Sequence, residues 1–255
     1  MFIDTHCHIN DERLYENRAE IIRAAREKGV CKMIVIGWDL ASSRIAVEIA
    51  NEFDGVYAAV GFHPENLDEI SDESLVEIET LCSNKNVIAI GEIGLDYHWF
   101  KEQDHRNKQK EWFIKQIKLA NKLNLPVSIH AREASEDTFT ILKEHPVIKG
   151  CVLHCYSGSL EMAKRFSELN VYFGFDGPIT FKNAQNPRNC VSYIPNNRLL
   201  SETDCPYMTP VPYRGKDNKP EYIPLIVAKM AELKGLSIEM MEKQIEENCL
   251  KLYGI

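Results

Sequence analysis

The sequence lacks the features that define several large classes of protein. None of its eight cysteines forms a C-x-x-C pair and the chain is long, so we exclude a zinc ribbon and a small disulfide scaffold and expect reduced thiols. No apolar stretch approaches the roughly 20 residues that span a bilayer, so no membrane segment is expected. The first residues do not combine a basic segment with an apolar run, which argues against a signal peptide. We therefore expect a cytoplasmic protein.

Positive charge is also scarce. The chain has 30 Lys and Arg against 38 Asp and Glu, a formal net charge of −8. An acidic protein does not bind nucleic acid through a general basic surface, which argues against a passive DNA-binding module. A nuclease stays open, because bound metal ions and a few local Arg or Lys side chains can attract a phosphodiester.

Short runs rich in Val, Ile and aromatic residues alternate with longer segments of helical periodicity along most of the chain. Several runs are apolar on both faces, as buried parallel strands require. We expect eight strands, at 2–6, 32–37, 56–61, 87–91, 127–130, 151–154, 171–175 and 199–203. A last helix is expected to bury one side, with Ile238, Met241, Ile245, Cys249 and Leu252, and to end before Gly254.

Eight strand–helix units without a break in composition predict an α/β fold of the (β/α)₈ TIM-barrel type, which needs about 250 residues. We therefore expect a single domain over residues 1–255. The alternative, an open doubly wound sheet, normally has a phosphate-binding glycine loop after its first strand, where this chain has His6-Cys7-His8. Residues 206–224 are expected to form one long loop, and loops of that length usually have a function.

Metal-ligand residues stand where the predicted strands end. Because TIM barrels build their active sites at the C-terminal ends of their strands, these side chains converge in a closed barrel. In chain order they are His6, His8, Glu92, Asp96, His130, His154 and Asp204. Asp176, at the end of the seventh strand, leaves two interpretations open: it lines the site, or it caps the turn that follows.

Six of these residues predict a dinuclear metal site. They are four imidazoles (His6, His8, His130 and His154) and two carboxylates (Glu92 and Asp204), which suit divalent ions. A tetrahedral catalytic site uses three protein ligands, so six are better explained by two ions about 3.5–4 Å apart with a bridging carboxylate. The two histidines at 6 and 8 point to the same side of an extended chain, so both can reach one ion.

Around these residues the sequence resembles the TatD family of metal-dependent deoxyribonucleases, within the wider amidohydrolase group. The matching segments follow the family's order over nearly the whole chain: FIDTHCH at 2–8, GFHP at 61–64, GEIGLDY at 91–97, IHAR at 129–132, HCYSG at 154–158, ETDCP at 202–206 and RGKDNKP at 214–220. The glutamate after the fourth strand is specific, since many amidohydrolases place a modified lysine near there.

The resemblance implies a role for each ligand. His6 and His8 would bind one ion, which Asp204 joins, while His130 and His154 would bind the other and Glu92 would bridge the two. It also implies a Mg²⁺-dependent nuclease that acts on DNA ends, although such donors also accept Mn²⁺, Zn²⁺ or Fe²⁺.

For catalysis we expect Asp204 to act as general base, with Glu92 as the second catalytic residue. Three further side chains are candidates for binding the phosphate of the substrate, with a salt bridge at the rim of the site as the alternative for each. They are His63, Arg132 and Arg214.

Other functions use the same fold and metals. An amidase, lactonase or deaminase acting on a small molecule is the main alternative, and a decarboxylase is compatible but usually keeps one metal. A small-molecule enzyme would have a closed pocket with few charges, whereas a nuclease needs an open cleft with phosphate-binding Arg. A non-catalytic metal-binding partner protein is disfavoured, since a binding module has no use for six converging donors. No obligate protein partner is indicated, and we expect a monomer.

Overall fold

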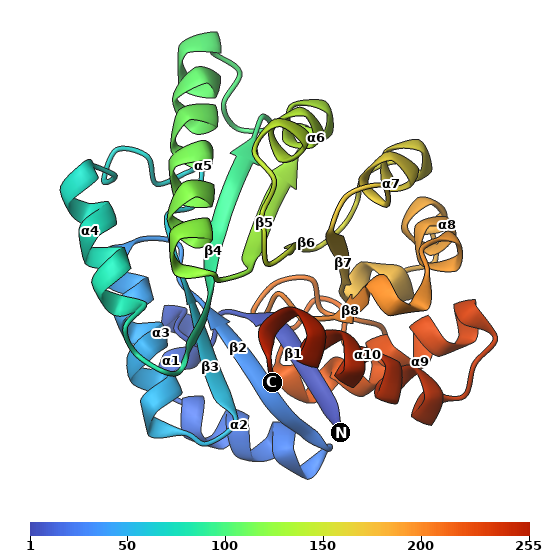
Figure 1. The fold of residues 1–255 in the computed structure, drawn as a ribbon. Helices are drawn as coiled ribbons and strands as arrows, with labels where there is room; N and C mark the ends of the chain where they lie inside the picture. Colours follow the sequence, from blue (N-terminus) through green and yellow to red (C-terminus); the bar gives the residue numbers. More distant parts are fainter.

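The computed structural model describes residues 1–255, and all eight cysteines are free in it. Eight parallel strands form one sheet in sequence order, and Figure 1 shows the helices arranged around the outside of that sheet. The predicted (β/α)₈ TIM barrel is therefore the observed fold. The strands are β1 (Phe2–Cys7), β2 (Val30–Ile36), β3 (Val56–Val60), β4 (Val87–Asp96), β5 (Val127–Arg132), β6 (Cys151–Leu153), β7 (Val171–Phe175) and β8 (Leu199–Ser201).

The helices cover the strands on the outside and enclose one hydrophobic core of 70 buried residues. None is long and apolar enough to cross a membrane. They are α1 (Glu12–Tyr15), α2 (Arg18–Glu27), α3 (Leu40–Glu52), α4 (Asp72–Leu81), α5 (Gln103–Leu123), α6 (Ser135–Glu144), α7 (Leu160–Phe166), α8 (Gln185–Tyr193), α9 (Ile223–Lys234) and α10 (Ile238–Tyr253), with short 3₁₀ turns η1 (Gly177–Thr180), η2 (Asn196–Arg198) and η3 (Pro220–Tyr222).

The last helix, α10, packs against β1 and β8 and brings the two ends of the chain to the same side of the barrel (Figure 1). Ser237 caps its first turn, and Gly254 ends it with φ +80°, a left-handed conformation that glycine adopts without strain. The residues predicted to be buried on one side of this helix are buried from Met241 onward. Ile238 is the exception: it lies in the first turn and is 42% exposed.

The barrel closes between β1 and β8 through buried polar groups. The Asp4 carboxylate accepts hydrogen bonds from the Thr203 amide at 3.0 Å and from its hydroxyl at 2.6 Å. The Ser201 hydroxyl donates to the Ile3 carbonyl at 2.8 Å. Beyond these contacts, the Asp204 amide donates to the His6 carbonyl at 2.9 Å, so the closure itself brings two predicted ligands together.

Strand β4 corrects the sequence prediction. We expected it to end at Gly91, but it continues to Asp96, so Glu92 and Asp96 lie within the strand rather than after it. Two glycines make this possible, because β4 and β5 approach unusually closely. Gly94 has φ +146°, and a Cβ on it would lie 2.0 Å from the His130 carbonyl oxygen. The pairing with β5 shifts register between Ile90 and Ile93 and then continues to Asp96.

The chain between β8 and α9 is irregular for most of its length. No helix or strand occurs between 202 and 219, after which η3 begins at Pro220 and α9 at Ile223. The predicted long loop therefore exists but ends earlier than expected. Pro224 lies in the first turn of α9, where a missing N–H breaks no helical hydrogen bond.

Candidate metal centre

The first group of donor atoms lies between β1 and the segment after β8. His6 Nε2 and His8 Nε2 are 3.2 Å apart, and His8 Nε2 is 3.3 Å from Asp204 Oδ1. Glu92 Oε2 lies 3.4 Å from His6 Nε2. Ligands about 2.1 Å from a tetrahedrally bound ion are about 3.4 Å from one another, so these four atoms have the spacing of one coordination shell.

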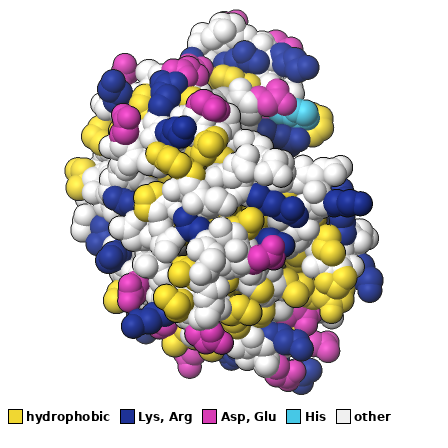
Figure 2. Space-filling model, turned by 90° about the vertical axis from the view of Figure 1, so that its right-hand side faces the viewer, with side chains coloured by type: hydrophobic (Ala, Val, Ile, Leu, Met, Phe, Trp, Pro, Cys, Tyr) yellow, Lys and Arg dark blue, Asp and Glu magenta, His cyan; other side chains and the backbone are white.

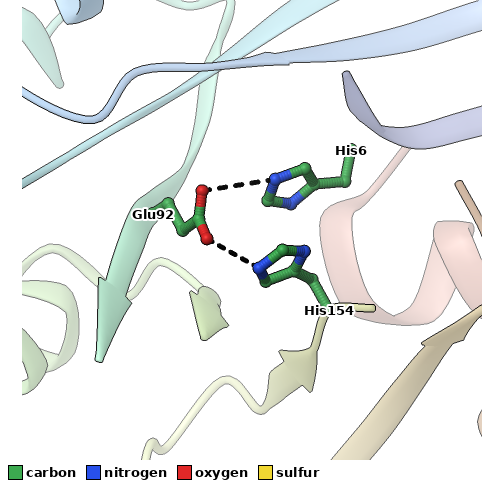
Figure 3. A group of neighbouring side chains, drawn as sticks. All are labelled: His6, Glu92 and His154. Atoms are coloured by element: carbon green, nitrogen blue, oxygen red, sulfur yellow. Dashed lines mark ion pairs between the residues drawn. The ribbon is translucent and has the colours of Figure 1, made fainter. Parts of the chain in front are cut away.

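The second group lies around the other oxygen of the same glutamate. Glu92 Oε1 is 2.9 Å from His130 Nδ1 and 2.6 Å from His154 Nε2, and the two nitrogens are 3.2 Å apart. Figure 3 shows Glu92 between His6 and His154, with one carboxylate oxygen directed to each ring. The structure thus brings together all six predicted ligands, with Glu92 common to both groups.

The hydrogen bonds on the far side of the rings show which nitrogens are free to bind a cation. His8 Nδ1 faces the Ile36 carbonyl at 3.2 Å, so this nitrogen carries the proton and Nε2 presents a lone pair. His130 Nε2 faces the Asp96 carboxylate at 3.0 Å, which leaves the lone pair on Nδ1. Lone pairs and carboxylate oxygens that face one another repel unless a proton or a metal ion lies among them. The donor set therefore fits divalent metal ions.

Asp96 orients the imidazole of His130 from behind. It is fully buried, and its Oδ1 accepts from the backbone amides of His98 at 2.9 Å and Trp99 at 3.1 Å, while Oδ2 faces His130. Metal-binding histidines commonly donate their other N–H to such a carboxylate, which fixes the tautomer and the ring. The sequence indicated only that Asp96 lies near the strand ends. Its hydrogen bond to the His130 imidazole is seen only in the structure.

Glu202 is a buried residue whose role the sequence did not predict. One of its oxygens accepts from the Cys155 amide and lies 3.7 Å from His154 Nδ1. The carboxylate fits because residue 174 is glycine: a Cβ there would lie 2.1 Å from Glu202 Oε2. The matching segment ETDCP contained this glutamate, but its position behind His154 depends on how β7 and β8 pack.

Both carboxylates that would bind cations are ionised at neutral pH. Burial raises the pKa of Glu92, but the imidazoles of His154, His63 and His130, in the form that carries a proton toward the carboxylate, outweigh burial, so the pKa lies well below its usual value. For Asp204, burial likewise opposes the hydrogen bond with His8, and the pKa ends below its usual value. The centre therefore presents negative charge to an incoming ion.

Five of the six donors, all but His6, line a cleft of about 810 Å³. Its walls carry several carboxylates and aromatic rings and a single Lys or Arg side chain, Arg132. Trp99 stands at the rim, 61% exposed, with the Arg132 guanidinium 5.5 Å from its ring centre. Figure 2 shows Lys, Arg, Asp and Glu interspersed over the side that carries α8 and α9, without a continuous basic area. In the cleft and on this face, attraction for a polyanion is therefore local.

Of the three predicted phosphate-binding residues, two lie at the cleft and one does not. His63 lies beside the second group, with Nε2 3.5 Å from Glu92 Oε1, and Arg132 lines the cleft. Arg214 does not line it: its guanidinium lies 4.3 Å above the Phe181 ring, in an adjoining hollow of about 280 Å³. Asp176 lines the cleft, and its side chain does not cap the turn that follows.

Fold and donor set together are those of a metal-dependent enzyme of the TIM-barrel type, and the comparisons with known proteins show that it is a hydrolase. The family model described as "TatD related DNase" matches residues 3–254. The chain therefore belongs to the TatD family.

Two curated relatives are named as metal-dependent hydrolases, both uncharacterized. YabD of Bacillus subtilis is 43% identical over the full length of both chains. YcfH of Escherichia coli K12 is 35% identical over 99% of this chain and 96% of its own. Among solved structures, the TatD homologue YjjV of Escherichia coli K12 superposes with a TM-score of 0.93 at 31% identity, over 100% of this chain and 98% of that one. A TatD-family hydrolase from Entamoeba histolytica, at 24% identity and a TM-score of 0.86 over 99% and 97% of the two chains, shares the fold.

Proposed function

We propose that this hydrolase is a deoxyribonuclease that cleaves DNA phosphodiester bonds from the end of a strand. The observation that carries the proposal is the position of Glu92, whose two oxygens face separate pairs of imidazoles at the floor of an open cleft (Figure 3). Two ions on either side of one carboxylate suit in-line displacement at phosphorus. The family description supports DNA as the substrate.

His6, His8 and Asp204 would hold one ion and His130 and His154 the other, with Glu92 between them. Such ions, Mg²⁺ first and Mn²⁺, Zn²⁺ or Fe²⁺ with the same donors, lower the pKa of water and offset charge on phosphoryl oxygens. Asp204 is 8% exposed and borders the cleft, and its lowered pKa keeps it ionised at neutral pH. It is therefore suited to accept the proton of the attacking water as general base.

Two cleft residues are suited to bind the phosphate. Arg132 makes no ion pair and no side-chain hydrogen bond within the chain, so its guanidinium is available for two parallel hydrogen bonds to phosphoryl oxygens. His63 Nδ1 accepts from the Glu65 amide at 3.2 Å, which leaves the proton on Nε2 for donation. Arg214 would contact only a substrate that extends beyond the cleft.

The test uses end-labelled single-stranded and duplex DNA oligonucleotides with protein that has been stripped of metal and reloaded with Mg²⁺ or Mn²⁺. Glu92→Gln removes the shared charge at nearly constant shape, and Glu52→Gln is the matched control, since Glu52 pairs with Arg18 on the outer surface at 3.0 Å. We expect metal-dependent shortening by the unmodified protein and the control, and a loss of at least about 100-fold in Glu92→Gln. Protein that holds two ions but cleaves no DNA with either metal would overturn the proposal.

One observation favours a second candidate, a hydrolase of small esters, amides or lactones. The cleft offers a single Lys or Arg side chain beside several carboxylates, and about 810 Å³ is within the usual range for small-molecule sites. Neutral substrates would tolerate such a lining better than a long polyanion. The same reloaded protein, tested against a panel of these substrates, separates the two candidates. We propose a monomer as the active form, because the two groups of donors and the cleft are complete without a second chain.

A further inference from the structure

A third group of ligand atoms lies in the cleft beside the two imidazole groups. It consists of Cys155 after β6, Asp176 after β7 and Asp204 after β8, and one donor atom from each lies within 4.8 Å of the others. All three residues line the cleft. The group contains no histidine, so its chemistry differs from that of the two groups around Glu92.

Asp176 gives an independent indication that this group binds a ligand. The residue is 3% exposed, and its Oδ2 is buried without any hydrogen-bond partner. It makes no ion pair with Lys or Arg, and it does not cap the 3₁₀ turn η1 that begins at Gly177. Burial and the charges of Glu202 and Asp204 raise the pKa of Asp176, so the ionised carboxylate is costly here, and a bound cation would remove that cost.

The backbone already holds two members of the group in place. Cys155 and Asp204 both adopt the left-handed region, with φ +43° and +54°, which is uncommon for residues other than glycine and recurs at functional sites. The Cys155 amide donates to the buried Glu202 carboxylate, and the Asp204 amide donates to the His6 carbonyl at 2.9 Å. The donors are therefore fixed by contacts that do not involve their own side chains.

We propose that Cys155, Asp176 and Asp204 form a third cation site, which takes a thiophilic divalent ion such as Zn²⁺. A sulfur ligand together with carboxylates suits Zn²⁺, whereas Mg²⁺ prefers oxygen ligands alone. Three protein ligands leave a coordination position open toward the cleft. The Cys155 thiol releases its proton to solvent when the ion binds. Asp204 would be common to this site and to the His6–His8 group.

The number of bound ions tests the site without any assay of activity. Metal-free protein is saturated with Zn²⁺, separated from the excess and analysed for metal. We expect three equivalents in the unmodified chain and two in Cys155→Ser and in Asp176→Asn. The matched controls are Cys31→Ser, at an exposed cysteine, and Asp68→Asn, at a carboxylate whose side chain is 99% exposed, and both should keep three. The two equivalents retained in the site variants show that the histidine groups are intact.

Cobalt supplies a second readout that depends on the sulfur alone. A Co²⁺–thiolate bond gives a charge-transfer band in the near ultraviolet, so we expect this band in the unmodified protein and in Cys31→Ser but not in Cys155→Ser. Two Zn²⁺ equivalents in the unmodified chain, three in Asp176→Asn, or a cobalt band that survives in Cys155→Ser would each overturn the proposal. Should a variant bind no metal, absence of the cobalt band from the unmodified protein would still overturn the proposal. None of these outcomes bears on the nuclease proposal, which is tested by DNA cleavage.

Discussion

Replacing Asp96 by asparagine should change which nitrogen of His130 carries the proton. Asp96 Oδ1 accepts from two backbone amides, so the amide oxygen of asparagine would take that position and its NH₂ group would face His130 Nε2. Nε2 must then accept, and the proton moves to Nδ1. There it points at Glu92 Oε1, 2.9 Å away, and Nδ1 can no longer bind a cation.

The expected loss of metal affinity follows from losing the carboxylate that orients His130. Mutation of a carboxylate that orients a metal-binding histidine usually costs 10–100-fold in metal affinity, or about 1.4–2.7 kcal/mol. Only the group of His130 and His154 should be affected, because His6 and His8 have their own supports at Ser128 and Ile36. One of the two Mn²⁺ equivalents should therefore weaken while the other keeps its dissociation constant.

The assay is a competition titration of Mn²⁺ against a fluorescent chelator, with Asp137→Asn as the control. Asp137 accepts from the Tyr97 hydroxyl at 2.6 Å and pairs with Lys110 at 2.7 Å, and it touches no histidine of the centre. Its variant should titrate like the unmodified protein. If Asp96→Asn keeps both dissociation constants, then Asp96 does not set the proton position on His130, and the reasoning is refuted.

Three further outcomes are expected. Gly94→Ala should lower the free energy of unfolding by about 3 kcal/mol or more in thermal unfolding, because its Cβ would lie 2.0 Å from the His130 carbonyl oxygen. The control Gly235→Ala, whose Cβ would have no atom within 4 Å, should lower it by only about 1 kcal/mol. Equal losses of stability in the two variants would refute this explanation. Thr203→Val should cost about 1–3 kcal/mol in urea unfolding, since it leaves a buried Asp4 oxygen without its 2.6 Å donor, and an unchanged midpoint would contradict the role given to this contact. Removing metal with a chelator should lower the melting temperature, and readdition at about 100 times the dissociation constant should restore about 2.7 kcal/mol for each ion bound; a melting temperature that does not change with metal would argue against a metal site in the folded chain.

The sequence predicted the barrel because its strands are continuous apolar runs separated by helical periodicity. It predicted that the six donors would lie close together because the C-terminal ends of barrel strands converge, whatever the helices between them do, and the structure brings them together. It failed at β4, where Gly91 and Gly94 resemble the end of a strand. Those glycines are instead needed for the close approach to β5, which only the pairing with Ser128 and His130 reveals.

Residues that act from behind the donors were harder to predict. Asp96 and Glu202 are carboxylates among many, and their roles depend on which side chain lies next to them across neighbouring strands. Arg214 shows the same limit for loops: its motif fixes its order in the chain, but the path of the irregular segment after β8 takes its guanidinium to Phe181, outside the cleft. Local sequence does not encode such a path.

The most direct test of the dinuclear centre is a crystal structure of the protein soaked with Mn²⁺ and measured for anomalous scattering. Two peaks are predicted on opposite sides of the Glu92 carboxylate, one beside His6, His8 and Asp204 and the other beside His130 and His154. A single peak, or no peak beside Glu92, would contradict the account.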